Sequence, residues 1–194
     1  MSCDAMKEEL TYEESMKNVV EWARKTVTPD DFWVDVGANY GYITFCLLMR
    51  NKVRGSLMIE PFPQGPLAKF MVPKAVLDEK KKARFWKSPD FPERASFINR
   101  MGGESEEIQV TTLDEILGNI DGPLVLKIDC EFTEPLIWKG MQKILPKVRA
   151  ACIEYFPFIL EKDAKLNPLE FLADIEKAGF KIEMGEHDIY LSRP

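Results

Sequence analysis

The chain has 194 residues, of which 45% are hydrophobic and 30% are charged, and its formal net charge at pH 7 is −6. This length suits one domain with a substantial core, and the composition excludes a disordered or fibrous chain. Nucleic-acid surfaces draw heavily on lysine and arginine, so the negative charge argues against nucleic acid as a partner.

Compartment signals point to a soluble cytoplasmic protein. The first ten residues carry acids and lack the apolar run of a secretion signal. The longest apolar stretch near a predicted helix, residues 43–49, is too short to span a bilayer, so no membrane partner is expected. The four cysteines lack zinc-finger spacing, which favours reduced thiols in a reducing compartment.

The first half of the chain begins with a predicted helix, after which predicted strands and helices alternate. Apolar residues at three- and four-residue spacing predict an amphipathic helix over residues 13–27, which Pro29 ends. We therefore expect an N-terminal helical segment, residues 1–28, packed on one domain formed by residues 29–194. The next predicted elements are, in chain order, a strand over 32–36, a turn over 37–41, a helix over 42–49 and a strand over 56–59.

The middle of the chain is less regular. Residues 75–77 and 83–86 predict short strands around a charged turn, and residues 88–107 predict a loop over the sheet edge. The later predicted elements are a strand over 109–112, a helix over 113–117, a strand over 124–129, a helix over 135–145, a strand over 150–155, a helix over 168–178 and strands over 181–183 and 188–191.

This alternation predicts the fold class. Strands that alternate with helices form a doubly wound, mostly parallel α/β sheet covered on both faces. The last two strands have no helix between them, so we expect an antiparallel hairpin at one edge. Ligands of such sheets bind beyond the carboxyl ends of the strands. Four acids lie at or near these ends: Asp35, Glu60, Asp129 and Glu154.

The turn after the first strand carries a cofactor signal. Gly37 and Gly41 allow tight turning and close approach to a ligand, but Asn39 replaces the middle glycine of dinucleotide-binding turns. Asp35 would repel a pyrophosphate and attract the ammonium and sulfonium groups of S-adenosylmethionine. Glu60 is placed to accept hydrogen bonds from both ribose hydroxyls. A capping role for Asp35 and a surface position for Glu60 are the structural alternatives.

Several motifs together resemble the FkbM family of methyltransferases. Residues 35–42 resemble the family's opening motif, and Glu60-Pro61, residues 112–116, residues 127–131 and Ile153-Glu154 resemble its later motifs in order. The resemblance covers roughly residues 30–160. It implies a seven-stranded Rossmann-like sheet of the class I methyltransferase type, and O-methylation with S-adenosylmethionine. The cofactor residues that we expect on these grounds are Asp35, Gly37, Ala38, Asn39, Tyr40, Gly41, Glu60, Pro61 and Asp78.

The sequence departs from the family pattern in two places. Phe132 stands where the family usually has glycine, which bears on the substrate pocket. The segment between Glu60 and Ala75 is short, which bears on the adenine pocket. Asp78 would contact the adenine amino group there, although a role in the turn explains it equally well.

Acids and one lysine form the predicted catalytic group. Lys127, Asp129 and Glu131 alternate onto one side of a strand while the strand continues. Asp129 is the first candidate for a general base, Lys127 would anchor substrate or keep Asp129 ionised, and Glu131 and Glu154 would complete the cluster. Oxygen ligands of this kind also suit Mg²⁺, which we rank lower. A buried pair of Lys127 with a carboxylate that only fixes the strand ends is the structural alternative.

The favoured function is methylation of a hydroxyl group on a small molecule or glycan. An inactive S-adenosylmethionine-binding regulatory module is the alternative that the two departures suggest. Methylation of protein or nucleic acid is a third possibility, and the sequence does not indicate an oligomeric state.

Overall fold

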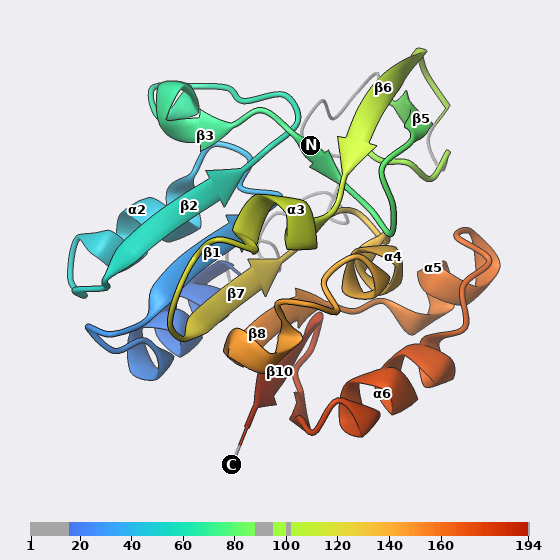
Figure 1. The fold of residues 1–194 in the computed structure, drawn as a ribbon. Helices are drawn as coiled ribbons and strands as arrows, with labels where there is room; N and C mark the ends of the chain where they lie inside the picture. Colours follow the sequence, from blue (N-terminus) through green and yellow to red (C-terminus); the bar gives the residue numbers. More distant parts are fainter. Residues whose placement is uncertain (1–15, 88–94, 100–101, 194) are drawn as a thin grey trace, which may run out of the picture.

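A computed structural model describes residues 16–87, 95–99 and 102–193. Its main sheet has seven strands in the order β3-β2-β1-β7-β8-β10-β9, which confirms the predicted mostly parallel α/β fold (Figure 1). Strands β9 and β10 pair antiparallel with each other, and β10 pairs antiparallel with β8, as the predicted edge hairpin requires. The strands of this sheet are β1 (Phe32–Val36), β2 (Gly55–Ile59), β3 (Met71–Val72), β7 (Leu124–Ile128), β8 (Val148–Glu154), β9 (Lys181–Met184) and β10 (Asp188–Ser192).

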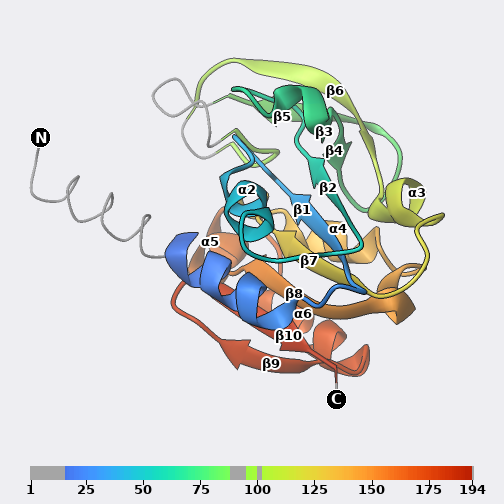
Figure 2. The same cartoon turned by 90° about the vertical axis from the view of Figure 1, so that its left-hand side faces the viewer.

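Helices cover both faces of this sheet. One face carries a helix over residues 16–26 and α2 (Tyr42–Leu48), and Figure 2 shows these two helices together on one side of the strands. The other face carries α3 (Leu113–Leu117), α4 (Glu134–Lys139) and α6 (Pro168–Lys177). A further helix, α5 (Pro157–Lys162), follows β8 and was not predicted. None of the helices among the described residues is long and apolar enough to cross a membrane.

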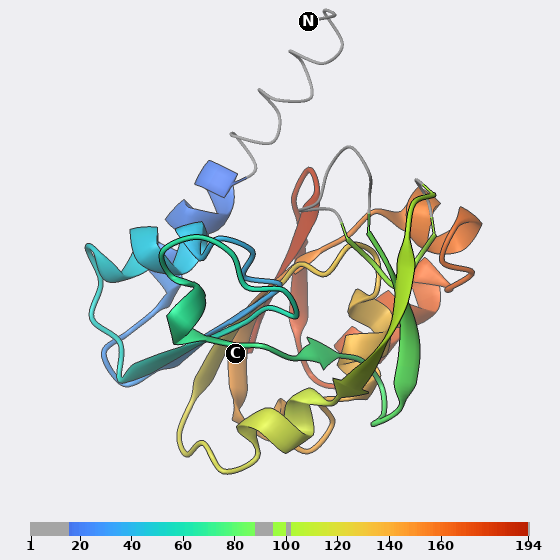
Figure 3. The same cartoon turned by 90° about the horizontal axis from the view of Figure 1, so that it is seen from above.

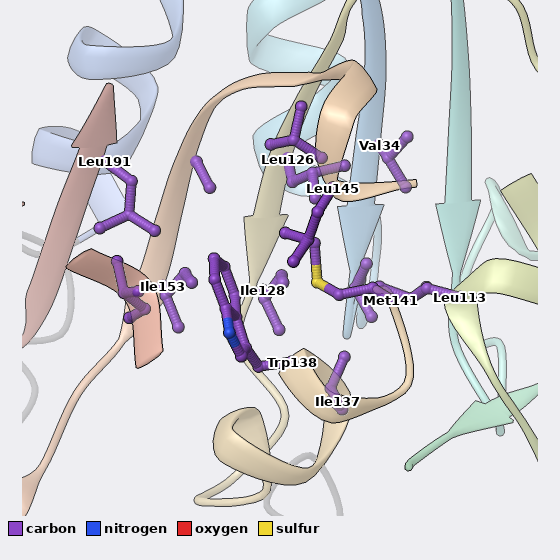
Figure 4. Close-up of a cluster of buried hydrophobic side chains, with 14 of the residues drawn as sticks. Val34, Leu113, Leu126, Ile128, Ile137, Trp138, Met141, Leu145, Ile153 and Leu191 are labelled. Carbon is purple, nitrogen blue, oxygen red and sulfur yellow. The ribbon is translucent and has the colours of Figure 1, made fainter. Parts of the chain in front are cut away.

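Successive side chains of a strand point to opposite faces of the sheet, so the central strands contribute to a hydrophobic core on each face. In β1, Trp33 packs on the side of helix 16–26, whereas Val34 and Val36 join the larger cluster on the opposite face. All five residues of β7 are buried, as expected for a parallel strand covered on both faces. Figure 4 shows the larger cluster, in which Trp138 and Ile137 of α4 meet Ile128 of β7 and Ile153 of β8.

A second, three-stranded sheet has the order β4-β6-β5 and lies beside α4 (Figure 3). Its strands are β4 (Ala75–Val76), β5 (Lys82–Trp86) and β6 (Ser105–Thr111). The two predicted strands around the charged turn exist, but each pairs with β6 and not with the other. The predicted loop over 88–107 is therefore wrong at its end, since residues 105–107 belong to β6. This stretch is exposed and has no apolar alternation to reveal it. Residues 88–94 and 100–101 of that loop lie outside the described residues, as do residues 13–15 of the first predicted helix.

The helix predicted over 135–145 is also wrong in extent, because α4 ends at Lys139 and a 3-10 helix covers Leu145–Lys147. Two contacts outside the helix explain its early end. A Cβ added to Gly140 would lie 2.1 Å from the carbonyl oxygen of Leu77, so the backbone here packs directly against the chain after β4. The N–H groups of Lys143 and Ile144 donate to the Asp114 carboxylate of α3, and the Ile144 N–H also donates to the Met141 carbonyl in a turn.

The connection from β2 to β3 contains no α-helix. Residues 60–70 make this parallel crossover with a single 3-10 helix, Ala68–Phe70, where parallel strands are usually joined through a full helix. The short segment between Glu60 and Ala75 is thus the place where no α-helix covers the sheet between two parallel strands.

Candidate active site

The carboxyl ends of β1, β2, β7 and β8 form the candidate site. From β1 the chain adds β2 and β3 on one side, and later β7 and β8 on the other, so the order of strands reverses between β1 and β7. Open α/β sheets bind ligands at such a point. Of the predicted site residues, the turn over 37–41, Glu60, Asp129 and Glu154 follow or end these four strands.

The glycine turn lies tightly against its neighbours. Gly37 has a φ of 72°, and a Cβ at this position would lie 1.8 Å from the carbonyl oxygen of Asp129. The N–H groups of Gly37 and Ala38 both donate to the carbonyl of Ile59, at 2.9 and 3.1 Å. Gly41, with a φ of 80°, is the N-cap residue directly before α2. Only glycine fits at position 37, because both the conformation and the space exclude a side chain.

Asp35 is completely buried beneath this turn. Its Oδ2 accepts a hydrogen bond from Thr44 at 2.7 Å, and its Oδ1 lies 3.3 Å from the ammonium of Lys127. Asp35 therefore meets a cation of the protein itself. The expected attraction of Asp35 for a cationic ligand stays a prediction.

Lys127 joins three parts of the site. Its ammonium donates to the carbonyl of Gly37 at 2.7 Å, and it lies between the carboxylates of Asp35 and Asp129, 3.4 Å from the latter. Burial opposes its charged form, but the charges of Asp129 and Asp35 more than compensate, and the pKa of Lys127 is held well above its usual value. Lys127 is thus a charged structural link, and only Asp129, with 44% of its side chain exposed, faces outward.

Glu60 follows β2 and braces the glycine turn. Its two carboxylate oxygens accept hydrogen bonds from the N–H groups of Asn39, at 3.0 Å, and Phe62, at 3.1 Å. Burial raises the pKa of Glu60, and these hydrogen bonds and the charge of Lys127 partly offset the effect. A carboxylate has about four acceptor positions, so roughly two are left for a ligand. Pro61 continues the chain away from the strand.

The turn after β7 is strained. Glu131 and Phe132 have φ values of 52° and 74°, a region that residues other than glycine rarely adopt. Phe132 is 7% exposed and packs edge-to-face on Phe156. Three hydrogen bonds hold the turn: Thr133 Oγ1 to the Cys130 carbonyl, the Cys130 N–H to Glu134 and Ser96 Oγ to the Glu131 carbonyl. Strain of this kind persists only where the surroundings enforce it.

Glu134 is a site residue that the sequence analysis missed. It is 1% exposed, and its carboxylate accepts the Cys130 N–H at 2.7 Å. Burial, with a smaller contribution from the charges of Asp129 and Glu131, raises the pKa of Glu134 to about 8. Its position in the first turn of a helix before Pro135 was a signal for a capping acid, but nothing in the pattern indicated burial.

Glu154 ends β8 on the same side of the site. Its Oε2 is buried and has no hydrogen-bond partner among the residues that the structure describes. Burial raises its pKa well above the usual value, and the nearby charges of Asp129 and Glu134 act in the same direction. Asp188 lies directly opposite on β10.

The remaining predicted residues lie around this centre. Tyr40 is 52% exposed and its hydroxyl donates to Gln64. The carboxylate of Asp78 pairs with Lys81 at 2.8 Å in the turn before β5, and its role toward an adenine ring stays a prediction. Within the described ranges, no group of three or more His, Cys, Asp or Glu side chains is arranged to hold a metal ion, so the magnesium hypothesis has no ligand cluster to support it.

A comparison with a solved methyltransferase structure agrees with this architecture. No family model and no curated protein matches the sequence. The crystal structure of the methyltransferase FkbM from Methylobacillus flagellatus KT matches with a TM-score of 0.55 at 17% identity, over 85% of this chain and 44% of that one. Ribosomal protein L11 methylase from Lactobacillus delbrueckii subsp. bulgaricus matches with a TM-score of 0.47 at 11% identity, over 93% of this chain and 80% of that one.

The chain spans less than half the length of the FkbM methyltransferase structure that it matches. At this identity the similarity concerns the fold and not the activity. With the strand order and the edge hairpin, it shows that the chain has the class I methyltransferase fold.

Proposed function

We propose that the chain is an S-adenosylmethionine-dependent methyltransferase. The observation that carries the proposal is the arrangement at the reversal point of the sheet, where Gly37 leaves no room for a side chain and Glu60 stands beside it. This is the place where a nucleoside cofactor binds in a sheet of this order.

The residues present fit this cofactor. Glu60 is held by two backbone N–H groups and keeps acceptor positions for the two ribose hydroxyls. The group formed by Asp35, Lys127 and Asp129 contains two carboxylates and one ammonium, so its net negative charge favours a cationic ligand. When bound, the cofactor would supply a methyl group activated on a sulfonium.

The protein's own residues would orient the acceptor and take its proton. Asp129 is the exposed carboxylate of the group and would accept the proton of an acceptor hydroxyl. Lys127 would hold the Asp129 carboxylate in place through their ion pair at 3.4 Å, and Asp35 positions Lys127. Glu131 and Glu154 would line the acceptor side. We favour a hydroxyl on a small molecule or glycan as the acceptor and the cytoplasm as the location.

A second candidate is a module that binds the cofactor without turnover. Phe132 favours it, because a bulky buried side chain stands in a strained turn directly after Glu131. Methyl transfer to any member of a broad panel of hydroxyl acceptors would exclude this candidate, whereas cofactor binding without transfer would support it.

Calorimetry with S-adenosylmethionine and S-adenosylhomocysteine tests the proposal. We expect saturable binding, and we expect Glu60→Gln to weaken it about tenfold because charged hydrogen bonds to ribose are lost. Glu183→Gln, on the exposed edge strand β9, is the control and should bind like the natural sequence. Absence of binding at millimolar cofactor would end the proposal.

A further inference from the structure

The outer face of α2 is apolar and exposed. Its inner residues Ile43, Thr44 and Leu47 are buried against the sheet. Phe45, Leu48 and Met49 nevertheless have exposed fractions of 50%, 43% and 67%. Phe45 and Met49 are four residues apart and Leu48 lies between them, so the three side chains lie close together along one side of the helix.

The missing crossover helix explains this exposure. Residues 60–70, which join β2 to β3, contribute only the 3-10 helix Ala68–Phe70. On its other flank α2 is covered, since Arg24 of helix 16–26 donates to the Cys46 carbonyl at 2.8 Å and Asn51 donates to the Arg24 carbonyl at 3.0 Å. Figures 1 and 2 both show α2 between helix 16–26 and the segment that leads to β3.

Two more exposed aromatic residues lie in the segments that flank the start of α2. Tyr40 is 52% exposed and Phe70 is 62% exposed. The segment that carries Phe70 packs against the start of α2, because a Cβ on Gly41 would touch Leu67 and Met71 at 3.0 Å. We call Tyr40, Phe45, Leu48, Met49 and Phe70 the α2 patch. Clustered exposed apolar side chains of this kind mark interaction sites.

Cations flank the α2 patch: Arg24 donates to the Cys46 carbonyl of α2, Arg50 follows Met49 in the chain, and Lys69 lies 5.0 Å from the centre of the Phe70 ring. Residues 16–74 carry eight lysines and arginines but only two exposed acids, Glu21 and Asp30, although the whole chain has a net charge of −6. The other acids of this segment are the buried, paired Asp31 and Asp35 and the half-buried Glu60. The cations are Lys17, Arg24, Lys25, Arg50, Lys52, Arg54, Lys69 and Lys74.

These two properties together select one kind of partner. In a symmetric dimer the α2 patch would face the same patch of a second copy. The lysines and arginines that flank it would then meet the same cations of the other copy and repel them. A nucleic acid would use the cations and aromatic rings but leave Leu48 and Met49 without a partner. An anionic lipid surface accepts apolar side chains at its acyl boundary and lysines and arginines at its headgroups. We propose that the α2 patch docks this protein on the surface of an anionic membrane.

Vesicle flotation tests this proposal without reference to methyl transfer. The natural sequence should float with phosphatidylcholine vesicles that contain phosphatidylserine, bind pure phosphatidylcholine vesicles much more weakly, and lose affinity as salt is raised. The double variant Phe45→Gln, Met49→Gln should bind at least about tenfold more weakly, because two apolar side chains no longer enter the acyl boundary.

The matched control is Phe158→Gln, Leu169→Gln, which removes two side chains that are 68% and 73% exposed on α5 and α6. This variant should bind like the natural sequence. All the substituted side chains are exposed, and unchanged thermal unfolding of both variants would verify their folds. Equal loss of binding in the two variants, or no binding of the natural sequence to phosphatidylserine vesicles, would overturn the proposal. So would a dimer, or an RNA oligonucleotide complex, that depends on Phe45 and Met49 while vesicle binding does not.

Discussion

Phe132 occupies a backbone conformation that suits glycine, with a φ of 74°. For a residue with a Cβ this conformation costs roughly 1–2 kcal/mol. The ring compensates by burial, since it is 7% exposed and packs on Phe156. Two opposing effects, strain and packing, therefore meet in one side chain, and substitutions can separate them.

We expect Phe132→Gly to be more stable than Phe132→Ala by about 1 kcal/mol, because both lose the ring but only glycine relieves the strain. Both should be less stable than the natural sequence, since truncating a buried phenylalanine costs about 3–5 kcal/mol. Urea unfolding measures the difference.

Phe171, which is 3% exposed within α6, supplies the control. There the order should reverse, with glycine about 1 kcal/mol less stable than alanine, because glycine disfavours a helix. Finding alanine more stable than glycine at position 132, as at position 171, would show that Phe132 is not strained.

At the scale of elements, one buried cation connects two strands and a loop. Lys127 of β7 contacts Asp35 of β1 and the carbonyl of Gly37. Its side chain is 7% exposed and that of Asp35 is 0% exposed, so neither can be solvated alone.

Lys127→Met should destabilise the protein by about 3–5 kcal/mol, because it leaves the Asp35 charge buried without a partner. Adding Asp35→Asn should recover much of this loss, and the double-mutant cycle by urea unfolding gives the coupling between the two. The exposed pair Lys82 and Glu107, treated in the same way, should show almost no coupling. Additive effects for Lys127 and Asp35 would contradict a linking role.

The elements that could be predicted from the sequence are those with a strong local pattern. The continuous apolar run of β7, the alternating β1 and the helix α6 with Gly179 after it are of this kind. The α/β class, the hairpin and the acids at the strand ends follow from them. The FkbM resemblance added the seven-stranded sheet.

Tertiary contacts decided the rest. Pairing of β4 and β5 with β6 depends on residues far along the chain, and α4 ends early because Gly140 packs on Leu77. The sequence analysis raised a buried pair of Lys127 with a carboxylate, but nothing local indicates that Asp35 is the buried partner or that Glu134 is buried. The roles of these residues toward a cofactor or acceptor stay predictions.

At the scale of the whole molecule, buried carboxyl groups link stability to pH. The pKa of Glu134 is about 8 in the folded protein, against an ordinary value of 4.5. Between these values the unfolded chain releases the proton while the folded protein keeps it. The free energy of unfolding therefore falls as the pH rises through this window, by an amount on the order of a few kcal/mol. Glu154 acts in the same direction.

Glu134→Gln should remove part of this dependence, since an amide oxygen can still accept the Cys130 N–H but does not ionise. Urea unfolding at several pH values should show the variant gaining stability over the natural sequence as the pH rises from about 5 to about 8. Glu183→Gln, on the exposed strand β9, should show no such trend. A constant difference between Glu134→Gln and the natural sequence would contradict the burial argument.

The same scale explains why no membrane partner was expected from the sequence. That expectation concerned long apolar spans, and the folded chain has none among its described residues. The α2 patch forms only on folding, because α2 has apolar residues on two sides and the folded chain covers only one of them.

The contact between Gly37 and the Asp129 carbonyl also restricts how a ligand could enter. The space between Gly37 and the Asp129 carbonyl does not admit even a methyl group, so the chain ends of β1 and β7 are in direct contact there. A molecule that reaches from Glu60 to Asp129 has to lie across the top of the turn and cannot pass between the strands. A substitution that adds a side chain at position 37 would have to push the turn after β1 away from the Asp129 carbonyl, and so would open this contact between the two strand ends.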